Sequence, residues 1–156
     1  MNKNLSKLLI FGAISLVIIL IAITLWRGQE AAERATVTID DQVLAVRIAD
    51  NVWERRQGLS GLEAQEVKAQ GMLFVFDQAR VQDFWMKGMQ LDLDVVWIRE
   101  GKIVGLEHAV PAPAAGEAPA KFSSAPIPVD MVLELPAGYI DVFGLVGGLS
   151  LKVDLP

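Results

Sequence analysis

The pattern of hydrophobic and polar positions divides the chain near residue 27. Residues 8–26 carry no charged side chain, whereas the remainder mixes short apolar runs with charged and turn-forming residues. A helix of 19 residues is about 28 Å long, which matches the hydrocarbon core of a bilayer. The stretch is longer than the apolar part of a signal peptide, and no small-residue cleavage site follows it. The pattern therefore predicts a retained transmembrane helix.

Basic residues indicate how this helix is oriented. Lys3 and Lys7 precede it, whereas Arg27 and Arg34 on its other side are mixed with glutamates. Because positive charge is retained on the cytoplasmic side, we expect a single-pass protein of the cytoplasmic (inner) membrane with its N-terminus inside the cell. The rest of the chain then lies in the periplasm or at the cell exterior, and the lipid bilayer is one partner of the chain.

Apolar residues beyond the anchor occur in the short runs and alternating patterns that are typical of β-strands. Residues 36–39 and 43–48 flank Asp40 and Asp41, which predicts a hairpin. Two strands expected to be buried on both faces cover residues 71–76 and 81–87. Further strands are expected at residues 93–98, 102–110, 131–135 and 149–156.

Cap signals predict one or two short helices. Asn51 and Glu54 are spaced as in a capping box, so residues 52–57 are expected to be helical, with Gly58 ending the helix. Residues 61–71 and 139–149 are predicted as turns or further short helices.

Because strands rarely alternate with long helices here, a parallel α/β architecture is not expected. The predicted fold class is mainly β: a small antiparallel β-sandwich or partly closed barrel with one or two short helices, preceded by one transmembrane helix. Residues 111–128 contain five of the seven prolines and are predicted to form a long surface loop. The expected organisation is a cytoplasmic tip and anchor at 1–26, a linker at 27–35 and one domain at 36–156.

Charge and cysteine content exclude several classes of function. Only two of the 14 basic residues and none of the 19 acidic residues precede residue 27, so the remainder has a net charge of −7. Such a surface repels phosphate backbones, and nucleic acid is not an expected partner. The chain has no cysteine, which excludes disulfides, thiolate catalysis and cysteine-ligated metals.

Four segments together resemble the domain-of-unknown-function 192 family, also catalogued as uncharacterised protein family 0127. They are residues 48–61, 71–76, 84–98 and 132–138, with sequences IADNVWERRQGLSG, GMLFVF, FWMKGMQLDLDVVWI and VLELPAG. The resemblance implies a compact, mostly β fold that often follows a signal peptide or membrane anchor, and it implies no established activity. The family usually has proline at Asp92, Gly-Asp at residues 147–148, and Leu-Met-Gly at residues 59–61.

The segment around Trp85 is the main candidate for a binding surface. If it is a strand, Trp85 and Lys87 share one face, with Asp83 and Asp94 nearby in the sequence. An indole beside an ammonium group suits a ligand-binding shelf as well as a packed rim. Gly88 permits a bulge or a close approach of the backbone. Lys87 is costly to bury alone, so a carboxylate partner is expected.

Other polar motifs have simpler structural interpretations. Asp92 and Asp94 imitate the metal-binding pair of some sugar transferases, but no nucleotide-binding pattern surrounds them. His108 is the only histidine and is interpreted as a strand residue, and the serines at 123–124 are interpreted as turn residues because no nucleophile elbow is present. Neither a metal nor a cofactor is expected.

Two hypotheses of function remain open, and whether the protein is an enzyme is one of the differences between them. The first is a binding or interaction module of the cell envelope, in which Trp85, Lys87 and part of the 111–128 loop contact a sugar, peptide or envelope protein. The second is a carboxylate-dependent hydrolase or lyase that acts on envelope glycans or peptides, with Asp83 and Asp94 as acid and base.

Overall fold

The computed structural model describes residues 16–19 and 33–156. The chain divides into two compact units, Met1–Ala32 and Glu33–Pro156. In the first unit, residues 16–19 are helical, and the rest of the predicted anchor lies outside the described residues. None of the helices in the described part of the chain is long and apolar enough to cross a membrane.

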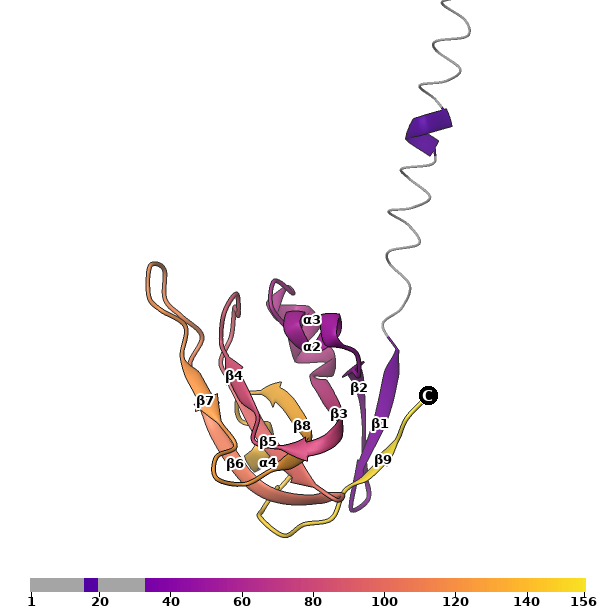
Figure 1. The fold of residues 1–156 in the computed structure, drawn as a ribbon, viewed down its shortest axis with the longest axis vertical. Coiled ribbons are helices and arrows are strands. Elements are labelled where there is room, and N and C mark those ends of the chain that lie inside the picture. The colour runs from indigo at the N-terminus through magenta and orange to yellow at the C-terminus, as the bar shows by residue number, and fades with distance from the viewer. Residues whose placement is uncertain (1–15, 20–32) are drawn as a thin grey trace, which may run out of the picture. The chain divides into compact units, whose positions relative to one another are not determined.

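The second unit contains one seven-stranded sheet and a separate two-stranded ribbon (Figure 1). The strand order in the sheet is β6-β5-β8-β3-β2-β1-β9. These strands are β1 (Arg34–Ile39), β2 (Gln42–Ala49), β3 (Met72–Arg80), β5 (Leu93–Arg99), β6 (Lys102–Val110), β8 (Val129–Pro136) and β9 (Lys152–Asp154). The β4–β7 ribbon consists of β4 (Asp83–Trp85) and β7 (Lys121–Ser123). The predicted β1–β2 hairpin is confirmed, and the strands expected at residues 93–98 and 102–110 pair as a second hairpin, β5–β6.

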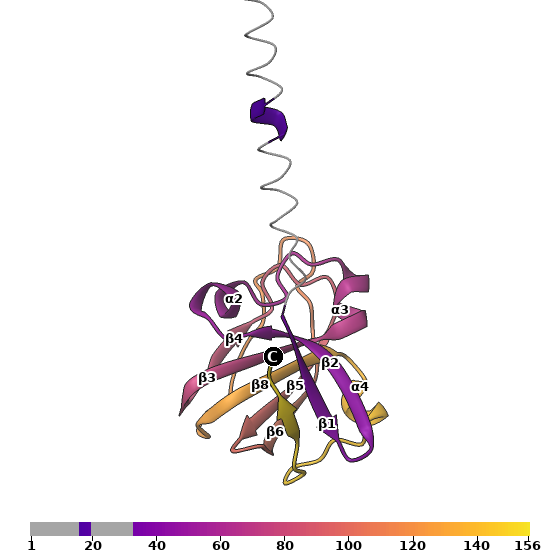
Figure 2. The same ribbon diagram turned by 90° about the vertical axis from the view of Figure 1, so that its right-hand side faces the viewer.

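One pair of neighbouring strands in the sheet, β2 and β3, is parallel, and the other pairs are antiparallel. A parallel pair needs a crossover connection, which α2 (Val52–Gln57) and α3 (Ala64–Gln70) provide at one end of the sheet (Figure 2). The side chain of Asn51 begins α2 by accepting hydrogen bonds from the N–H groups of Trp53 and Glu54, both at 3.1 Å. The predicted helix and its cap are therefore confirmed.

The segment before β9 links the two edges of the sheet. The N–H groups of Gly148 and Leu151 donate to the carbonyls of Ile103 (2.8 Å) and Gly101 (2.8 Å), and the N–H of Ile103 donates to the carbonyl of Leu149 (2.9 Å). The chain then continues into β9 at the opposite edge. The sheet is thus a curled half-barrel. The predicted mainly β class is confirmed, and of the two predicted architectures the partly closed barrel is nearer to the structure.

Two apolar clusters pack on opposite faces of the sheet. On β8, Leu133 and Leu135 belong to the cluster that also contains Ile140 of α4 (Tyr139–Val142). Val132 belongs to the other cluster, which also contains Val67 of α3 and against which Phe84 and Phe122 of the ribbon pack. Because side chains alternate along a strand, Glu134 points to the same face as Val132.

The strand predicted at residues 81–87 is shorter than expected and is not buried on both faces. Only Asp83–Trp85 pair as a strand, with β7 as partner. Asp83 and Trp85 are exposed, whereas Phe84 between them packs against the second cluster. The physical reason is that β4 belongs to a two-stranded ribbon, so only one of its faces has a sheet to pack on.

The loop predicted at residues 111–128 contains β7 and a buried serine. The hydroxyl of Ser124 accepts a hydrogen bond from the N–H of Gln82 (3.0 Å) and donates one to the carbonyl of Ile127 (2.8 Å). These bonds attach the loop to the start of β4. The interpretation as a turn residue is therefore confirmed for Ser124, whose carbonyl accepts from the N–H of Ile127, but not for Ser123, which is the last residue of β7.

Candidate ligand-binding cavity

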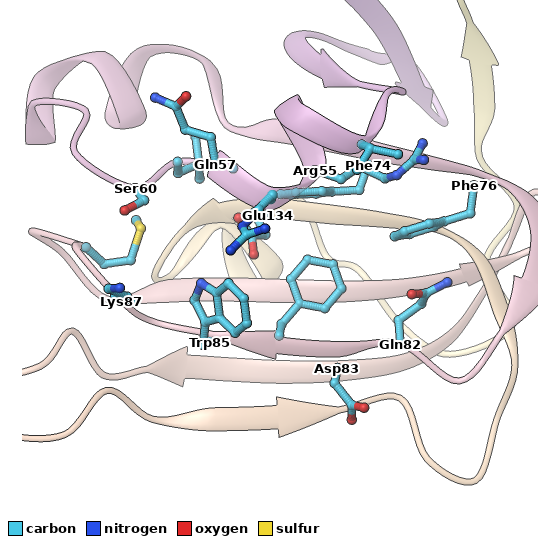
Figure 3. Close-up of a pocket in the computed structure, with 16 residues that line it drawn as sticks. Arg55, Gln57, Ser60, Phe74, Phe76, Gln82, Asp83, Trp85, Lys87 and Glu134 are labelled. Carbon is cyan, nitrogen blue, oxygen red and sulfur yellow. The ribbon is translucent and has the colours of Figure 1, made fainter.

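A cavity of about 410 Å³ opens between α2, the β4–β7 ribbon and β8 (Figure 3). We call it the α2–β4 cavity. Its lining combines aromatic, aliphatic, cationic and acidic side chains. The lining residues are Val52, Arg55, Arg56, Gln57, Gly58, Leu59, Ser60, Phe74, Phe76, Gln82, Asp83, Phe84, Trp85, Lys87, Met89 and Glu134. The volume is in the range of sites for small organic molecules.

Aromatic rings form the inner wall of the cavity. The ring of Phe84 meets that of Phe74 edge-to-face, with centroids 5.0 Å apart, and lies 5.7 Å from Trp97. It also stacks on Phe122 of β7 at 5.8 Å. These contacts fix the ribbon against the sheet and give the cavity a rigid apolar base. Trp85 follows Phe84 and remains half exposed at the opening.

Helix α2 brings two arginines to the cavity, and they differ in their surroundings. The guanidinium of Arg55 donates to the carbonyls of Val75 (2.9 Å) and Asp50, and it lies 5.4 Å from the centre of the Phe76 ring. Arg56 is exposed, and among the described residues no carboxylate lies within ion-pair distance of it. Arg55 therefore serves the scaffold, whereas the charge of Arg56 is available to a ligand.

A tight turn after β4 positions Lys87. The side chains of Met86 and Met89 are buried, and the N–H of Met89 donates to the carbonyl of Met86 at 3.2 Å. Lys87 and Gly88 therefore occupy the exposed tip of the turn. Gly88 has a φ of 74°, and a Cβ atom at this position would overlap the Oγ of Ser60. The predicted close approach of the backbone at Gly88 is confirmed.

Glu134 is the functional candidate that sequence reasoning missed. Its side chain enters the cavity from β8, and the residue is only 5% exposed. No hydrogen bond within the described residues reaches its carboxyl group, and burial raises the pKa of Glu134 from 4.5 to about 8. The carboxyl group is therefore mostly protonated at neutral pH. A glutamate within the apolar run VLELP was the signal that could have indicated it.

Asp94, one of the predicted site residues, does not line the cavity. It pairs in register with Leu135 of β8, so it faces the opposite side of the sheet from Glu134. Its carboxylate oxygens accept hydrogen bonds from the N–H groups of Ala109 (2.9 Å) and Ile140 (2.8 Å). The structure therefore does not bring Asp94 into the cavity with Trp85 and Lys87; this aspartate connects backbone segments on the other face of the sheet.

The other predicted site residues, Trp85, Lys87 and Asp83, all line the α2–β4 cavity. The carboxylate of Asp83 points away from the aromatic rings (Figure 3). Among the described residues no carboxylate lies within ion-pair distance of Lys87, so its expected acidic partner is not found there. The 111–128 loop contributes no side chain to the lining, which corrects that part of the prediction. The loop contacts the site indirectly, because Phe122 of β7 stacks on the ring of Phe84.

The remaining polar motifs lie elsewhere. The carboxylate of Asp92 accepts a hydrogen bond from the N–H of Ala112 at 2.9 Å. His108 is exposed, with its Nδ1 atom 3.9 Å from a carboxylate oxygen of Asp141. Within the described residues no three potential metal ligands among histidine, aspartate and glutamate are grouped together.

Comparison with known proteins identifies the family. A model of the DUF192 family (domain of unknown function 192), described as "Uncharacterized ACR", matches residues 35–153. The chain belongs to this family. The comparison with curated proteins finds no match to the DUF192 chain.

Two solved structures are similar to this DUF192 domain. One is a Sinorhizobium meliloti 1021 protein described as a "putative transcription regulator", with 31% identity and a TM-score of 0.62 over 78% of this chain and 92% of the other. The second is a protein of unknown function from Novosphingobium aromaticivorans DSM 12444. It has 22% identity and a TM-score of 0.59 over 76% of this chain and 83% of the other. The second likeness concerns the fold alone.

The four segments that carry the family resemblance converge on the α2–β4 cavity. Residues 48–61 contribute α2 and the chain after it, and residues 71–76 contribute two phenylalanines. Residues 84–98 contribute the aromatic strand and Lys87, and residues 132–138 contribute Glu134. Segments that are far apart in the sequence thus meet at one place on the surface of the DUF192 domain.

Proposed function

We propose that this DUF192 domain is a binding module of the cell envelope and that the α2–β4 cavity is its site for a small ligand. The observation that carries the proposal is the carboxyl group of Glu134. It is buried in a cavity with an aromatic base, and it has no hydrogen-bond partner among the described residues.

A buried polar group without a partner is costly, because folding removes its contacts with water and replaces them with nothing. The oxygen atoms of Glu134 are not among the fully enclosed polar atoms that lack a partner, so they can be reached from the cavity that the residue lines. A ligand that forms a hydrogen bond with Glu134 would supply the missing contact. The half-exposed Trp85 provides a further contact for such a ligand. Arg56 and Lys87 do so too, since both are exposed and have no carboxylate within ion-pair distance among the described residues.

The second candidate function is acid catalysis by Glu134. A carboxyl group that stays protonated at neutral pH suits a general acid. Glycoside hydrolysis also needs a second carboxylate on the opposite side of the scissile bond. Asp94 faces the other side of the sheet, and the carboxylate of Asp83 points away from the aromatic rings (Figure 3). This arrangement favours binding over hydrolysis.

The proposal includes the location expected from the sequence. The uncharged stretch at residues 8–26 supports a single transmembrane anchor in the inner membrane, with the DUF192 domain on the periplasmic or outer side. The net charge of −7 beyond the anchor argues against contact with nucleic acid, although the similar Sinorhizobium meliloti protein is described in terms of transcription. The partners proposed are therefore the bilayer and a ligand of the envelope.

Ligand-observed NMR on the full chain in lipid nanodiscs tests the proposal. A panel of small aromatic compounds and sugars is measured with the natural chain and with Ser60→Trp, which places a large ring in the cavity wall. We expect at least one class of compound to bind the natural chain and to lose binding in Ser60→Trp. Ala115→Trp, in an exposed loop, is the matched control. If the compounds bind Ser60→Trp as tightly as they bind the natural chain and Ala115→Trp, the proposed site is wrong.

A further inference from the structure

The α2–β4 cavity concentrates positive charge within an acidic domain. Residues 33–156 contain 11 lysines and arginines against 18 aspartates and glutamates, a net charge of −7. Three of the 11 cations, Arg55, Arg56 and Lys87, line this one cavity. Within the same described range, two acidic residues line it, Asp83 and Glu134.

The charge that a ligand meets is more positive than this count suggests. Burial keeps the carboxyl group of Glu134 protonated at neutral pH, so it contributes no charge, and Asp83 is exposed and points away from the rings. The ammonium group of Lys87 and the guanidinium of Arg56 lack a carboxylate partner among the described residues. A low-dielectric wall of aromatic rings strengthens the field of such charges inside a cleft.

We propose that the α2–β4 cavity binds a small organic anion with an apolar or aromatic body, whose acid group lies near Arg56 and Lys87 while its body rests on Phe74 and Phe84. The inference rests on the proposed binding function and names the chemical class of the ligand. Both cations are exposed and line the same cavity as the rings, so one molecule with an acid group at one end can contact both kinds of side chain.

The protonated state of Glu134 makes this binding depend on pH. Deprotonation would place a negative charge beside the ligand and reduce its affinity. The residues paired with Glu134 on the two adjacent strands, Met72 and Val95, are uncharged, so the charged groups near it come from other elements. Arg55 and Arg56 approach from α2, Asp83 from β4 and Lys87 from the following turn; Arg47 of β2 lies on the same face one strand beyond Met72, and Glu66 and Lys68 of α3 are exposed.

Three probes with the same ring and different charge separate the possible ligand classes: benzoate, benzyl alcohol and benzylammonium. Their dissociation constants are measured by ligand-observed NMR with the full chain in phosphatidylcholine nanodiscs, after subtraction of empty nanodiscs. At about pH 6.5 we expect benzoate to bind at least roughly fivefold more tightly than either other probe, because it alone pairs with the rim cations.

Variants that remove one positive charge test whether Arg56 and Lys87 cause the preference for benzoate. Arg56→Gln and Lys87→Gln should each weaken benzoate about three- to tenfold and should weaken benzyl alcohol much less. Lys102→Gln, which removes the same charge at the start of β6 outside the cavity, should change neither probe. Raising the pH to about 9.5 should weaken benzoate several-fold in the natural chain but not in Glu134→Gln, because only the natural chain gains a carboxylate there.

The outcomes distinguish this inference from the function on which it rests. Equal affinity for benzoate and benzyl alcohol, or tighter binding of benzylammonium, would overturn the anion preference and leave a ligand-binding cavity. Unchanged affinity for benzoate in both Arg56→Gln and Lys87→Gln would also overturn the anion preference and leave a ligand-binding cavity. If none of the three probes binds and Ser60→Trp also changes nothing in the wider panel, the proposed function itself is wrong.

Discussion

Asp94 and Glu134 lie on adjacent strands one residue out of register, and this offset places their carboxyl groups on opposite faces of the sheet. Asp94 is opposite Leu135, and Glu134 is opposite Val95. Asp94 accepts two backbone hydrogen bonds beside α4, whereas Glu134 enters the α2–β4 cavity with no partner among the described residues. One carboxylate therefore holds the scaffold together, and the other is available for function.

The first prediction concerns Asp94→Asn. The amide nitrogen of asparagine cannot accept a hydrogen bond, so the N–H of Ala109 or Ile140 loses its buried partner. We expect a loss of about 2 kcal/mol in the free energy of unfolding, measured by urea denaturation of the domain without its anchor. Probe affinity at a temperature where the variant is folded should stay unchanged. A selective loss of probe binding without loss of stability would show that Asp94 belongs to the site.

The second prediction concerns the pH dependence of stability. The pKa of Glu134 is raised from 4.5 to about 8 in the folded state, so the folded chain keeps a proton that the unfolded chain releases. The contribution of Glu134 to stability is thus complete below about pH 4.5 and is lost as the pH rises towards 8. We expect this group to lower the free energy of unfolding by about 4 kcal/mol between pH 5 and 8.

Urea denaturation across this pH range, with matched variants, isolates that effect. Glu134→Gln should remove most of the decline, because glutamine cannot ionise. Glu117→Gln, which removes one acidic group from an exposed loop, should retain it. Parallel stability curves for the natural domain and Glu134→Gln would mean that the carboxyl group of Glu134 is not held in its neutral form.

The third prediction concerns the turn that presents Lys87. In Gly88→Ala, the alanine must adopt a positive φ that is strained for a residue with a side chain, and its Cβ overlaps the Oγ of Ser60. We expect a loss of about 2–3 kcal/mol in stability, measured by urea denaturation, together with weaker benzoate binding. Gly116→Ala is the control, because Gly116 also has a positive φ (85°) but has open space around it. It should lose only about 1 kcal/mol. Adding Ser60→Ala to Gly88→Ala should restore the part of the loss due to the overlap.

Local patterns predicted the elements whose contacts are local. The β1–β2 hairpin and α2 follow from a few neighbouring residues, such as the Asn51 cap. The ribbon could not be predicted in this way, because β4 pairs with β7 nearly 40 residues later. The same limit explains the site. Trp85 and Lys87 were found from one unusual segment. Glu134 could not be found in this way, because it lines the cavity only through the contact of β8 with segments far away in the sequence.

The fourth prediction concerns orientation. The lysines at positions 3 and 7 favour an N-terminus in the cytoplasm, so the DUF192 domain should be exposed on the outer side of the inner membrane. Protease added to intact spheroplasts should degrade the domain, as judged by an antibody against its C-terminus. A cytoplasmic protein should remain intact in the same sample. Full protection of the domain, with digestion only after lysis, would reverse the orientation.

A crystal structure with 4-bromobenzoate tests most directly the claim that the α2–β4 cavity is a ligand site. The anomalous signal of bromine locates the probe without reference to the surrounding density. We expect a bromine peak beside the rings of Phe74 and Phe84, with the carboxylate of the probe directed to Arg56 and Lys87, and no such peak in Ser60→Trp. An empty cavity at probe concentrations that saturate binding in solution, or a single bromine peak elsewhere on the domain, would contradict it.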